Sequence, residues 1–428
     1  MRVVMPAKSK KFCPYFTAMK NALVKRTWDL IIVGGGAAGF FAAVNYLERK
    51  PKAKVLMLEA SNKLLAKVKI SGGGRCNVTH ACWEPKELVQ HYPRGKKEML
   101  GPFHQFACGD TVEWFDKRGV TLKIEEDGRM FPESNESQTI IDCLLDRAQQ
   151  LGLQIKLSQR VSRIVKEEDS YTLQTQSDKY NGRQLFWATG GSEMGYKILE
   201  DFGIDCESRV PSLFSFNIKE KGLTQLMGLS MPNTRVDIKK LKLSANGPLL
   251  ITHWGISGPG VLKLSAVGAR KFAECNYRFE ISVNWLNKPL EDIVEGLKEH
   301  IQEHRLKQIQ NMSYGAFPKR LWFYLLERAG GLDEKGRLFE SLKAKEINRL
   351  AELLHQDKYV VSGRTTYKEE FVTAGGIKLK AIDFKTMQLK EHSGFYLAGE
   401  VINVDAVTGG FNFQNAWTGG WIASQNMD

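Results

Sequence analysis

The chain has 428 residues, of which 43% are hydrophobic and 25% are charged, a composition typical of globular proteins with two or three domains. A mean hydropathy of −0.31, without long apolar runs or repeats, excludes membrane-spanning, coiled-coil, collagen-like and disordered classes. The excess of 61 Lys and Arg over 48 Asp and Glu gives a net charge of +13, which indicates a nucleic acid, an anionic cofactor or an acidic substrate, or simply a solvated basic surface.

The cysteines favour a reducing compartment. There are seven, without a CxxC pair, so we expect a cytoplasmic protein without disulfides. One tight cluster, Cys76, His80 and Cys82, lacks a fourth ligand for zinc, and we expect no metal site.

Residues 1–27 form a basic leader that carries Pro6 and Pro14 but no apolar core, so a signal peptide is not expected. Met19 is an alternative start. We leave this segment out of the fold prediction.

The first structured segment predicts a βαβ unit. Residues 29–33 and 54–59 are short apolar runs typical of buried strands, and residues 37–50 have the apolar spacing of a helix. Such a unit places its two strands parallel in one sheet.

Mixed α/β structure continues to about residue 205. Residues 112–115 and 140–151 are expected to be helical, and residues 154–157, 162–165 and 171–176 to be strands. Another buried strand is predicted at 185–191, where it ends in glycines.

The composition changes after residue 206. Alternating patterns at 235–238 and 278–285 predict a small antiparallel sheet or barrel, and the apolar spacing becomes helical over 289–355. A strand at 394–399 and a helix at 412–424 then return to the first domain, which makes that domain discontinuous.

One glycine motif carries the strongest functional signal. Gly34, Gly36 and Gly39 match GxGxxG between a predicted strand and helix, where glycines permit a tight turn and close approach of a pyrophosphate. Glu59 follows 20 residues after Gly39, at the end of the second strand, where its carboxylate can accept both ribose hydroxyls. The pattern predicts dinucleotide binding.

Two further glycine-rich segments favour FAD over NAD. Residues 71–77 read SGGGRCN and offer free backbone N–H groups and Arg75 to phosphates or the flavin edge. Residues 399–414 precede the last helix, whose N-terminus can stabilise the negative charge of a reduced flavin.

These motifs resemble those of bacterial FAD-dependent oxidoreductases of the aminoacetone-oxidase and bile-acid-reductase-like flavoprotein family. The resemblance runs from about residue 29 to the C-terminus, and SGGGRCN at 71–77 and GGFNFQNAW at 409–417 are its most specific parts. Other matching segments lie at 127–132, 188–191, 252–259, 373–376 and 398–400.

The resemblance implies an α/β fold with a glutathione-reductase-like FAD-binding Rossmann domain, an inserted β-barrel-like domain and a small helical insert. Its expected limits are 28–205 and 371–428 for the FAD-binding domain, 206–285 and about 356–370 for the barrel-like substrate domain, and 286–355 for the helical insert. The motifs and the resemblance together predict a cofactor site that consists of Gly34, Gly36, Ala37, Ala38, Gly39, Glu59, Ala60, Lys67, Ser71, Gly72, Gly73, Gly74, Arg75, Cys76, Asn77, Val161, Ala188, Thr189, Gly190, Gly191, Gly399, Glu400, Asp405, Gly409, Gly410, Phe411, Asn412 and Gln414.

The chain departs from the family pattern in two places. Leu65, Ala66 and Lys67 stand where the family carries Leu-Gly-Arg-Lys, and the glycine-rich stretch after Gly191 is shortened to residues 192–196. Both departures concern the surroundings of the flavin.

Three residues are candidates for catalysis. Arg75 is a candidate for stabilising an anionic flavin or a substrate carboxylate, or else for a structural ion pair. Cys76 is a redox candidate without a partner cysteine, and the alternative is that it only packs against the cofactor. His253 is a general-acid candidate, and the alternative is a histidine with a structural hydrogen bond.

The sequence therefore predicts a cytoplasmic FAD-dependent oxidoreductase that acts on a small organic substrate, as a monomer or homodimer without a membrane partner. No second GxGxxG follows a strand, so the flavin is reduced either by the substrate or by transiently docked NADH or NADPH. The +13 charge motivates one alternative, a flavin-dependent RNA-modifying enzyme, although nucleic acid is not the expected partner. A non-catalytic FAD-binding regulator is the second alternative.

Overall fold

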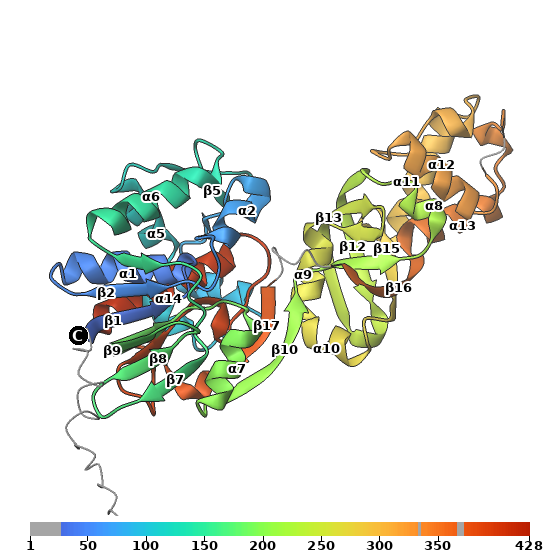
Figure 1. The fold of residues 1–428 in the computed structure, drawn as a ribbon. Helices are drawn as coiled ribbons and strands as arrows, with labels where there is room; N and C mark the ends of the chain where they lie inside the picture. Colours follow the sequence, from blue (N-terminus) through green and yellow to red (C-terminus); the bar gives the residue numbers. More distant parts are fainter. Residues whose placement is uncertain (1–26, 333–334, 366–371) are drawn as a thin grey trace, which may run out of the picture.

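The computed structural model describes residues 27–332, 335–365 and 372–428, and its apolar side chains form two separate cores. Residues 27–212 and 372–428 surround the first core and are called the sheet body. Residues 213–365 surround the second and are called the barrel body (Figure 1). The basic leader expected at 1–27 lies outside the described residues except for Thr27, which begins the first strand.

The sheet body is built on a nine-stranded sheet in the order β18-β19-β20-β9-β1-β2-β6, with β7 and β8 attached through β9. Its strands are β1 Thr27–Val33, β2 Val55–Leu58, β6 Gln154–Lys156, β7 Arg163–Lys166, β8 Tyr171–Gln174, β9 Lys179–Trp187, β18 Ile382–Asp383, β19 Gln388–Leu389 and β20 Phe395–Leu397. A small second sheet has the order β3-β5-β4, with β3 Thr79–His80, β4 Leu122–Ile124 and β5 Arg129–Pro132.

The centre of the main sheet is parallel. Ile31 in β1 pairs with Leu56 in β2 on one side and with Leu185 in β9 on the other, and β20 continues the parallel order beside β9. These strands are almost continuously apolar because helices cover the sheet and leave no solvated face. Their carboxyl ends therefore meet at one edge.

Helices complete the sheet body. They are α1 Ala37–Arg49, α2 Ala66–Gly74, α3 Pro85–Leu88, α4 Leu100–Gln105, α5 Cys108–Asp116, α6 Ser137–Gln150, α7 Glu193–Asp201 and α14 Phe411–Asn426, with 3₁₀ turns at Val89–His91, Leu379–Ala381 and Gly399–Val401. The first and last helices, α1 and α14, pack together: a Cβ on Gly420 would lie 3.0 Å from the carbonyl oxygen of Ala38, so a glycine permits the close approach.

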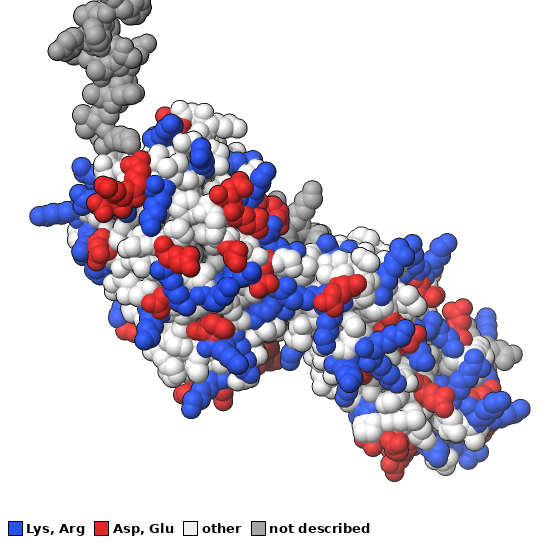
Figure 2. Space-filling view, turned by 90° about the horizontal axis from the view of Figure 1, so that it is seen from below, with Lys and Arg blue, Asp and Glu red and all other residues white. Residues whose placement is uncertain are grey.

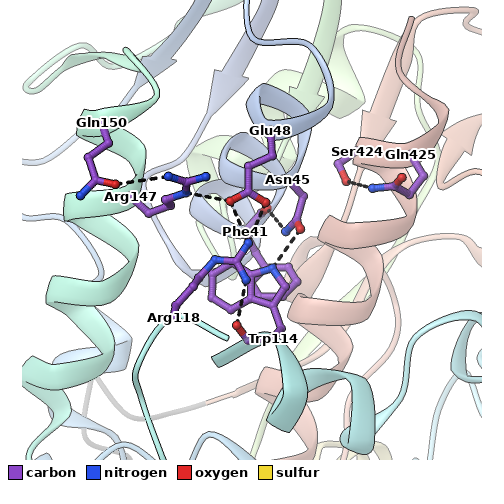
Figure 3. A network of polar contacts seen from close by, with 9 residues as sticks. All are labelled: Phe41, Asn45, Glu48, Trp114, Arg118, Arg147, Gln150, Ser424 and Gln425. Carbon is purple, nitrogen blue, oxygen red and sulfur yellow. Dashed lines mark hydrogen bonds and ion pairs between the residues drawn. The ribbon is translucent and has the colours of Figure 1, made fainter. Parts of the chain in front are cut away.

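A polar network fixes α1 against α5 and α6 (Figure 3). The Glu48 carboxylate accepts hydrogen bonds from Arg118 at 2.6 and 2.8 Å and from Arg147 at 2.8 Å. The Arg118 guanidinium also lies 3.7 Å from the ring centroid of Trp114, whose indole N–H donates to Asn45. The helix that follows the glycine motif is thus held from the side that faces away from α14.

The barrel body contains a closed six-stranded barrel in the order β11-β14-β13-β12-β15-β16. The strands are β11 Ser215–Ile218, β12 Ser230–Ile238, β13 Leu243–Thr252, β14 Gly255–Ser257, β15 Phe279–Asn284 and β16 Asp357–Thr365. The helices of this body are α8 Lys221–Thr224, α9 Pro259–Val267, α10 Ala269–Glu274, α11 Leu290–Glu303, α12 Lys319–Arg328 and α13 Ala344–His355, with 3₁₀ turns at Lys239–Leu241, Ile309–Asn311 and Phe339–Ser341. The sheet and the barrel confirm the predicted fold class.

Helices α11, α12 and α13 lie between β15 and β16 in the sequence, and a buried carboxylate joins α12 to the barrel. Asp357 accepts hydrogen bonds from Arg328 in α12 at 2.7 Å and from the indole of Trp285 at 3.1 Å. The Tyr359 hydroxyl donates to the same carboxylate. None of the helices in the described residues is both long and apolar enough to cross a bilayer.

Two strands connect the bodies (Figure 1). β10 Cys206–Ser212 pairs with β17 Val372–Ile377 in a two-stranded antiparallel sheet. β10 therefore lies outside the barrel, although its residues fall within the segment 206–285 that was expected to form the barrel-like domain. Arg94 makes a second connection, because it forms an ion pair with Asp405 and also donates to the carbonyl of Ala266 in α9 at 2.8 Å.

Candidate cofactor site

Four predicted segments converge at the carboxyl edge of the parallel sheet. Residues 34–39 follow β1, Glu59 follows β2, residues 188–191 follow β9 and Gly399 follows β20. Because these strands are parallel, their carboxyl ends share one edge, which is where open α/β sheets bind ligands.

The glycines of the first turn have different structural roles. Gly34 has φ +108°, and a Cβ there would lie 2.3 Å from the carbonyl oxygen of Ala188. A Cβ on Gly39 would lie 2.1 Å from the carbonyl oxygen of Gly34, whereas one on Gly36 would meet nothing within 4 Å. Packing alone therefore requires Gly34 and Gly39, while Gly36 keeps an open space at the start of α1.

Glu59 is held beside this turn. Its Oε2 accepts from the backbone N–H of Gly35 and its Oε1 from that of Ser61, both at 2.8 Å. The backbone N–H of Gln159 donates to the carbonyl of Glu59, which brings the buried Val161 to the same edge. This arrangement suits a ribose and an adenine.

The second glycine loop is a curved, exposed stretch of backbone at the end of α2. Gly72, Gly73 and Gly74 have φ of 59°, 69° and 87°, and a Cβ on Gly73 or Gly74 would meet nothing within 4 Å. The backbone N–H of Leu65 donates to the carbonyl of Gly35 at 2.8 Å, which ties this segment to the first glycine turn. Arg75, which is right-handed at φ −93° and ψ −19°, follows these left-handed glycines, and such a change of hand turns neighbouring N–H groups toward one side, an arrangement that binds anions.

The loop after β9 and the neighbouring strand β17 each contain a buried hydroxyl group without a partner. Thr189 Oγ1 and Thr373 Oγ1 are buried and have no hydrogen bond among the described residues. A Cβ on Gly191 would lie 2.4 Å from Thr373 Oγ1 and 2.7 Å from Glu400 Oε1. An unsatisfied buried hydroxyl costs about 1–3 kcal/mol, so these groups point to a ligand.

Glu400 links β17, α2 and α7 beside these threonines. Its Oε1 accepts from the backbone N–H of Thr373 at 2.9 Å, its Oε2 pairs with Lys67, and its backbone carbonyl accepts from the Tyr196 hydroxyl. Lys67, the one basic match to the family pattern, is therefore held at the cofactor edge.

The start of α14 contributes N–H groups. Gly410 is its N-cap at φ +90°, and a Cβ there would lie 2.5 Å from the carbonyl oxygen of Thr79. With its amide oriented to suit both neighbours, Asn77 accepts from the Gly410 N–H at 2.9 Å and donates to the Thr79 carbonyl. The N–H groups of the first turn of a helix have no intrahelical acceptors and carry the positive end of the helix dipole.

Three predicted cofactor ligands have side chains that are paired within the protein. Asp405 is fully buried and ion-paired with Arg94. Asn412 accepts from the backbone N–H of Ala406 at 3.0 Å and donates to its carbonyl at 3.1 Å, which closes the loop before α14. Gln414, also fully buried, accepts from two threonine hydroxyls and donates to a third, those of Thr79, Thr111 and Thr418.

The catalytic candidates near the glycine loop are also constrained. Arg75 pairs with Glu125 and lies 3.9 Å from the ring centroid of Phe131, as a structural ion pair would. Cys76 is completely buried, and burial raises the pKa of its thiol to about 12. A thiol in that state is not a nucleophile at neutral pH, so redox chemistry at Cys76 is not supported.

His253, the third catalytic candidate, lies in the barrel body. It is exposed in the turn between β13 and β14, where the Ile218 N–H donates to the Trp254 carbonyl at 2.8 Å. Ile218 is the end of β11 away from Ser212, where the chain leaves the sheet body. The turn therefore lies at the end of the barrel remote from the cofactor edge, and His253 is not placed to be its acid.

Two half-buried histidines lie beside α14. The His91 ring stacks on that of Phe411 with centroids 4.1 Å apart and planes 10° apart, and His80 Nδ1 lies 3.0 Å from the Gly409 carbonyl oxygen. Burial lowers the pKa of both rings, that of His91 to about 4 with His80 and Lys263 contributing. No sequence pattern pointed to His91, because it lies outside every motif and only the tertiary fold brings it to Phe411.

The residues at this edge fit FAD. The open space at Gly36 matches a pyrophosphate, and the carboxylate of Glu59 matches a ribose. The exposed glycine loop and the unpartnered threonine hydroxyls match further polar groups of a dinucleotide. No group of three or more His, Cys, Asp or Glu side chains in the described residues is arranged to hold a metal ion.

Comparisons with known proteins agree with this interpretation. The sequence pattern of a family described as "HI0933-like protein Rossmann domain" matches residues 28–426. The chain is 29% identical over 412 residues to the "Ribosomal RNA dihydrouridine synthase" of Escherichia coli strain K12, which covers 94% of this chain and 98% of that protein. It is 24% identical over 412 residues to the "3-dehydro-bile acid delta(4,6)-reductase" of Clostridium scindens, which covers 92% and 97%.

A solved structure supports the fold alone. The 3-ketosteroid-delta4-(5alpha)-dehydrogenase of Rhodococcus jostii RHA1 superposes with a TM-score of 0.51 at 12% identity, over 96% of this chain and 98% of that chain.

Proposed function

This chain belongs to the HI0933-like family of FAD-dependent oxidoreductases, and from that premise we propose that it reduces a carbon–carbon double bond conjugated with a carbonyl group. The observation that carries the proposal is the convergence of the glycine turn, Glu59, the second glycine loop and the start of α14 at one sheet edge.

The relatives support this reaction class. Dihydrouridine is uridine with hydrogen added across a ring double bond that is conjugated with a carbonyl, and a delta(4,6)-reductase acting on a 3-dehydro bile acid reduces double bonds conjugated with the 3-carbonyl. Both reactions add a hydride and a proton to an electron-poor alkene.

The described residues have separable tasks in this proposal. Glu59 would hold the ribose, the open turn at Gly36 and the N-terminus of α1 the pyrophosphate, and Lys67 and the Thr189 and Thr373 hydroxyls the region between the phosphates and the ring. Bound FAD supplies hydride transfer at its ring. The first-turn N–H groups of α14 would favour negative charge on the ring.

We propose NADH or NADPH as the electron donor, docking transiently, because reduction of an alkene consumes two electrons that the substrate cannot provide. The experiment is anaerobic absorbance of the purified holoenzyme after addition of either nucleotide. Bleaching of the flavin bands by one nucleotide is expected. A flavin that neither nucleotide reduces contradicts a reductase and favours an oxidase or dehydrogenase that its substrate reduces.

Two substrate classes are compatible with this chemistry. The small organic substrate expected from the sequence would be an enone, and the alternative is uracil within RNA. One observation favours RNA: outside residues 1–26, the excess positive charge is concentrated in the barrel body, where 24 Lys and Arg stand against 16 Asp and Glu over residues 213–365.

The two classes are separated by reoxidation of the reduced flavin. An unmodified uridine-containing RNA transcript and a 3-keto-4-ene steroid are added anaerobically to separate samples. Reoxidation by the RNA with a mass gain of about 2 Da in one nucleoside supports uracil reduction, since two hydrogens are added. Reoxidation by the steroid alone supports a small enone and contradicts the RNA assignment.

A further inference from the structure

The net positive charge of this protein is unevenly distributed. Residues 213–365 carry 24 Lys and Arg against 16 Asp and Glu, whereas residues 27–212 and 372–428 together carry 29 against 30. Figure 2 shows one face on which both signs are interleaved, with Lys and Arg more abundant than Asp and Glu over the barrel body. The cofactor-binding part is therefore nearly neutral. The positive surplus comes from the barrel body, with a net charge of +8, and from residues 1–26, which carry 7 Lys and Arg and no Asp or Glu.

A groove on the outside of the barrel concentrates this charge. It has a volume of about 550 Å³ and lies over β12 and β15, with Arg235, Lys239, Lys242 and Lys288 in its lining. Its one carboxylate, Asp237, accepts from Arg235 at 2.9 Å and is thereby neutralised.

The three lysines of the groove are free to bind an anion. Lys239 and Lys242 are exposed, and across residues 27–332, 335–365 and 372–428 none of the three forms an ion pair. Amides and hydroxyls complete the lining, among them Asn284, Asn287 and Ser244. Such a mixture of cations and neutral donors is typical of surfaces that contact phosphodiester oxygens.

The groove leads toward the sheet body. Antiparallel pairing through β13 and β14 places the Ile238 end of β12 at the end of the barrel where β11 begins, next to the connection with the sheet body. There Lys271 donates to the Leu241 carbonyl at 3.0 Å, and Arg270 reaches Ser208 Oγ in β10 at 3.5 Å. β10 pairs with β17, whose Thr373 lies at the cofactor edge.

We propose that this basic track, which consists of Arg235, Lys239, Lys242, Arg270, Lys271 and Lys288, binds the phosphodiester backbone of an RNA substrate and directs one strand toward the cofactor edge. The inference rests on the RNA candidate of the proposed function and adds the surface that would hold that substrate. A base that reacts at the flavin must leave its stack, so affinity has to come from backbone contacts elsewhere.

The test compares two triple variants of the holoenzyme with equal charge changes. The track variant is Lys239→Gln, Lys242→Gln and Lys288→Gln. The control is Lys298→Gln, Lys319→Gln and Lys345→Gln, three exposed lysines of α11, α12 and α13 without an ion pair in the described residues. Binding of a fluorescein-labelled, uridine-containing single-stranded RNA is measured by anisotropy from 50 to 300 mM KCl.

We expect the track variant to bind at least about 10-fold more weakly and the control to change less than about 3-fold. The slope of log Kd against log salt should fall by about 0.7 for each phosphate that the protein no longer neutralises, and thus by up to about 2 in the track variant. Equal weakening of both variants, or tighter binding of polyglutamate than of RNA, overturns the track as an RNA site.

Two measurements on the flavin distinguish a failure of the basic track from a failure of the proposed function. FAD content and bleaching by NADH or NADPH should be the same in both triple variants and in the unmodified protein, because no track residue lies in the cofactor site. RNA binding that depends on the track without any reduction of RNA uracil would refute uracil reduction but not the track. Reduction of RNA with unchanged binding in the track variant would refute the track but not the reaction.

Discussion

Gly36 separates what the fold requires from what the cofactor requires. Its φ of −96° and ψ of −169° are allowed for any L-residue, and a Cβ there would meet nothing within 4 Å. The stability of the Gly36→Val variant should stay within about 1 kcal/mol of that of the unmodified protein. The gain of about 0.4–1 kcal/mol from restricting the unfolded chain is opposed by the loss of a residue preferred at a helix N-cap, the position that Gly36 occupies before α1.

FAD affinity should respond differently. The branched side chain would fill the space through which the pyrophosphate reaches the N-terminus of α1. Loss of one charge-assisted hydrogen bond, worth about 1.5–3 kcal/mol, corresponds to roughly 10- to 150-fold weaker binding.

The assay has two parts, thermal unfolding of the apoprotein and titration of the apoprotein with FAD. Gly101→Val in α4 is the matched control, because that glycine also has open space around it but lies away from the sheet edge. It should leave FAD affinity unchanged and shift the stability of the apoprotein by no more than about 1 kcal/mol. Gly39→Ala should instead destabilise the apoprotein by about 1–3 kcal/mol, because its Cβ would collide with the Gly34 carbonyl. Unchanged FAD affinity in Gly36→Val would refute the assignment of the pyrophosphate to this turn.

Three further predictions concern buried groups. Asp405→Ala should destabilise the protein by about 3–5 kcal/mol in urea unfolding, because Arg94 would keep a nearly buried charge without its partner; a loss below about 1 kcal/mol would contradict this account. The pKa of His91 is lowered to about 4, so the neutral ring contributes stability that is complete above pH 6.5, the ordinary pKa, and is lost as the pH falls from 6.5 to 4. His91→Phe, which keeps an aromatic ring to stack on Phe411, should make the melting temperature less dependent on pH in that window, and an identical pH profile would argue against burial as the cause. Cys76→Ala should change the rate of flavin reduction by less than about 3-fold, since the buried thiol with a pKa of about 12 is protonated at neutral pH, and a loss above about 100-fold would restore Cys76 as a reacting group.

The sequence by itself determined the nucleotide-binding half of the protein. The apolar run of β1, the helical spacing of α1 and the acid at the end of β2 are local patterns whose periods and spacing follow from backbone geometry. The second glycine loop was also recognisable, because three successive glycines allow left-handed backbone that other residues resist. The fold class followed from these elements.

Only the tertiary structure decided which polar side chains at the site are free. Asp405, Asn412 and Gln414 stand in or beside the most specific motif, yet Arg94, the loop at Ala406 and three threonines satisfy them. Those partners are up to 335 residues away in the sequence, so no local pattern reveals them. Buried polar groups must be paired, and the chain pairs many of them across its core before any ligand can.

The barrel shows the same limit. Short strands such as β11 and β14 have weak periodic signals, and their closure depends on pairings between distant segments. In the closed barrel, His253 lies at the end remote from the cofactor edge, and Lys239, Lys242 and Lys288 line one groove. Composition alone set the sign and size of the charge, but strand order decided where it lies, because residues far apart in the chain become neighbours only when the barrel closes.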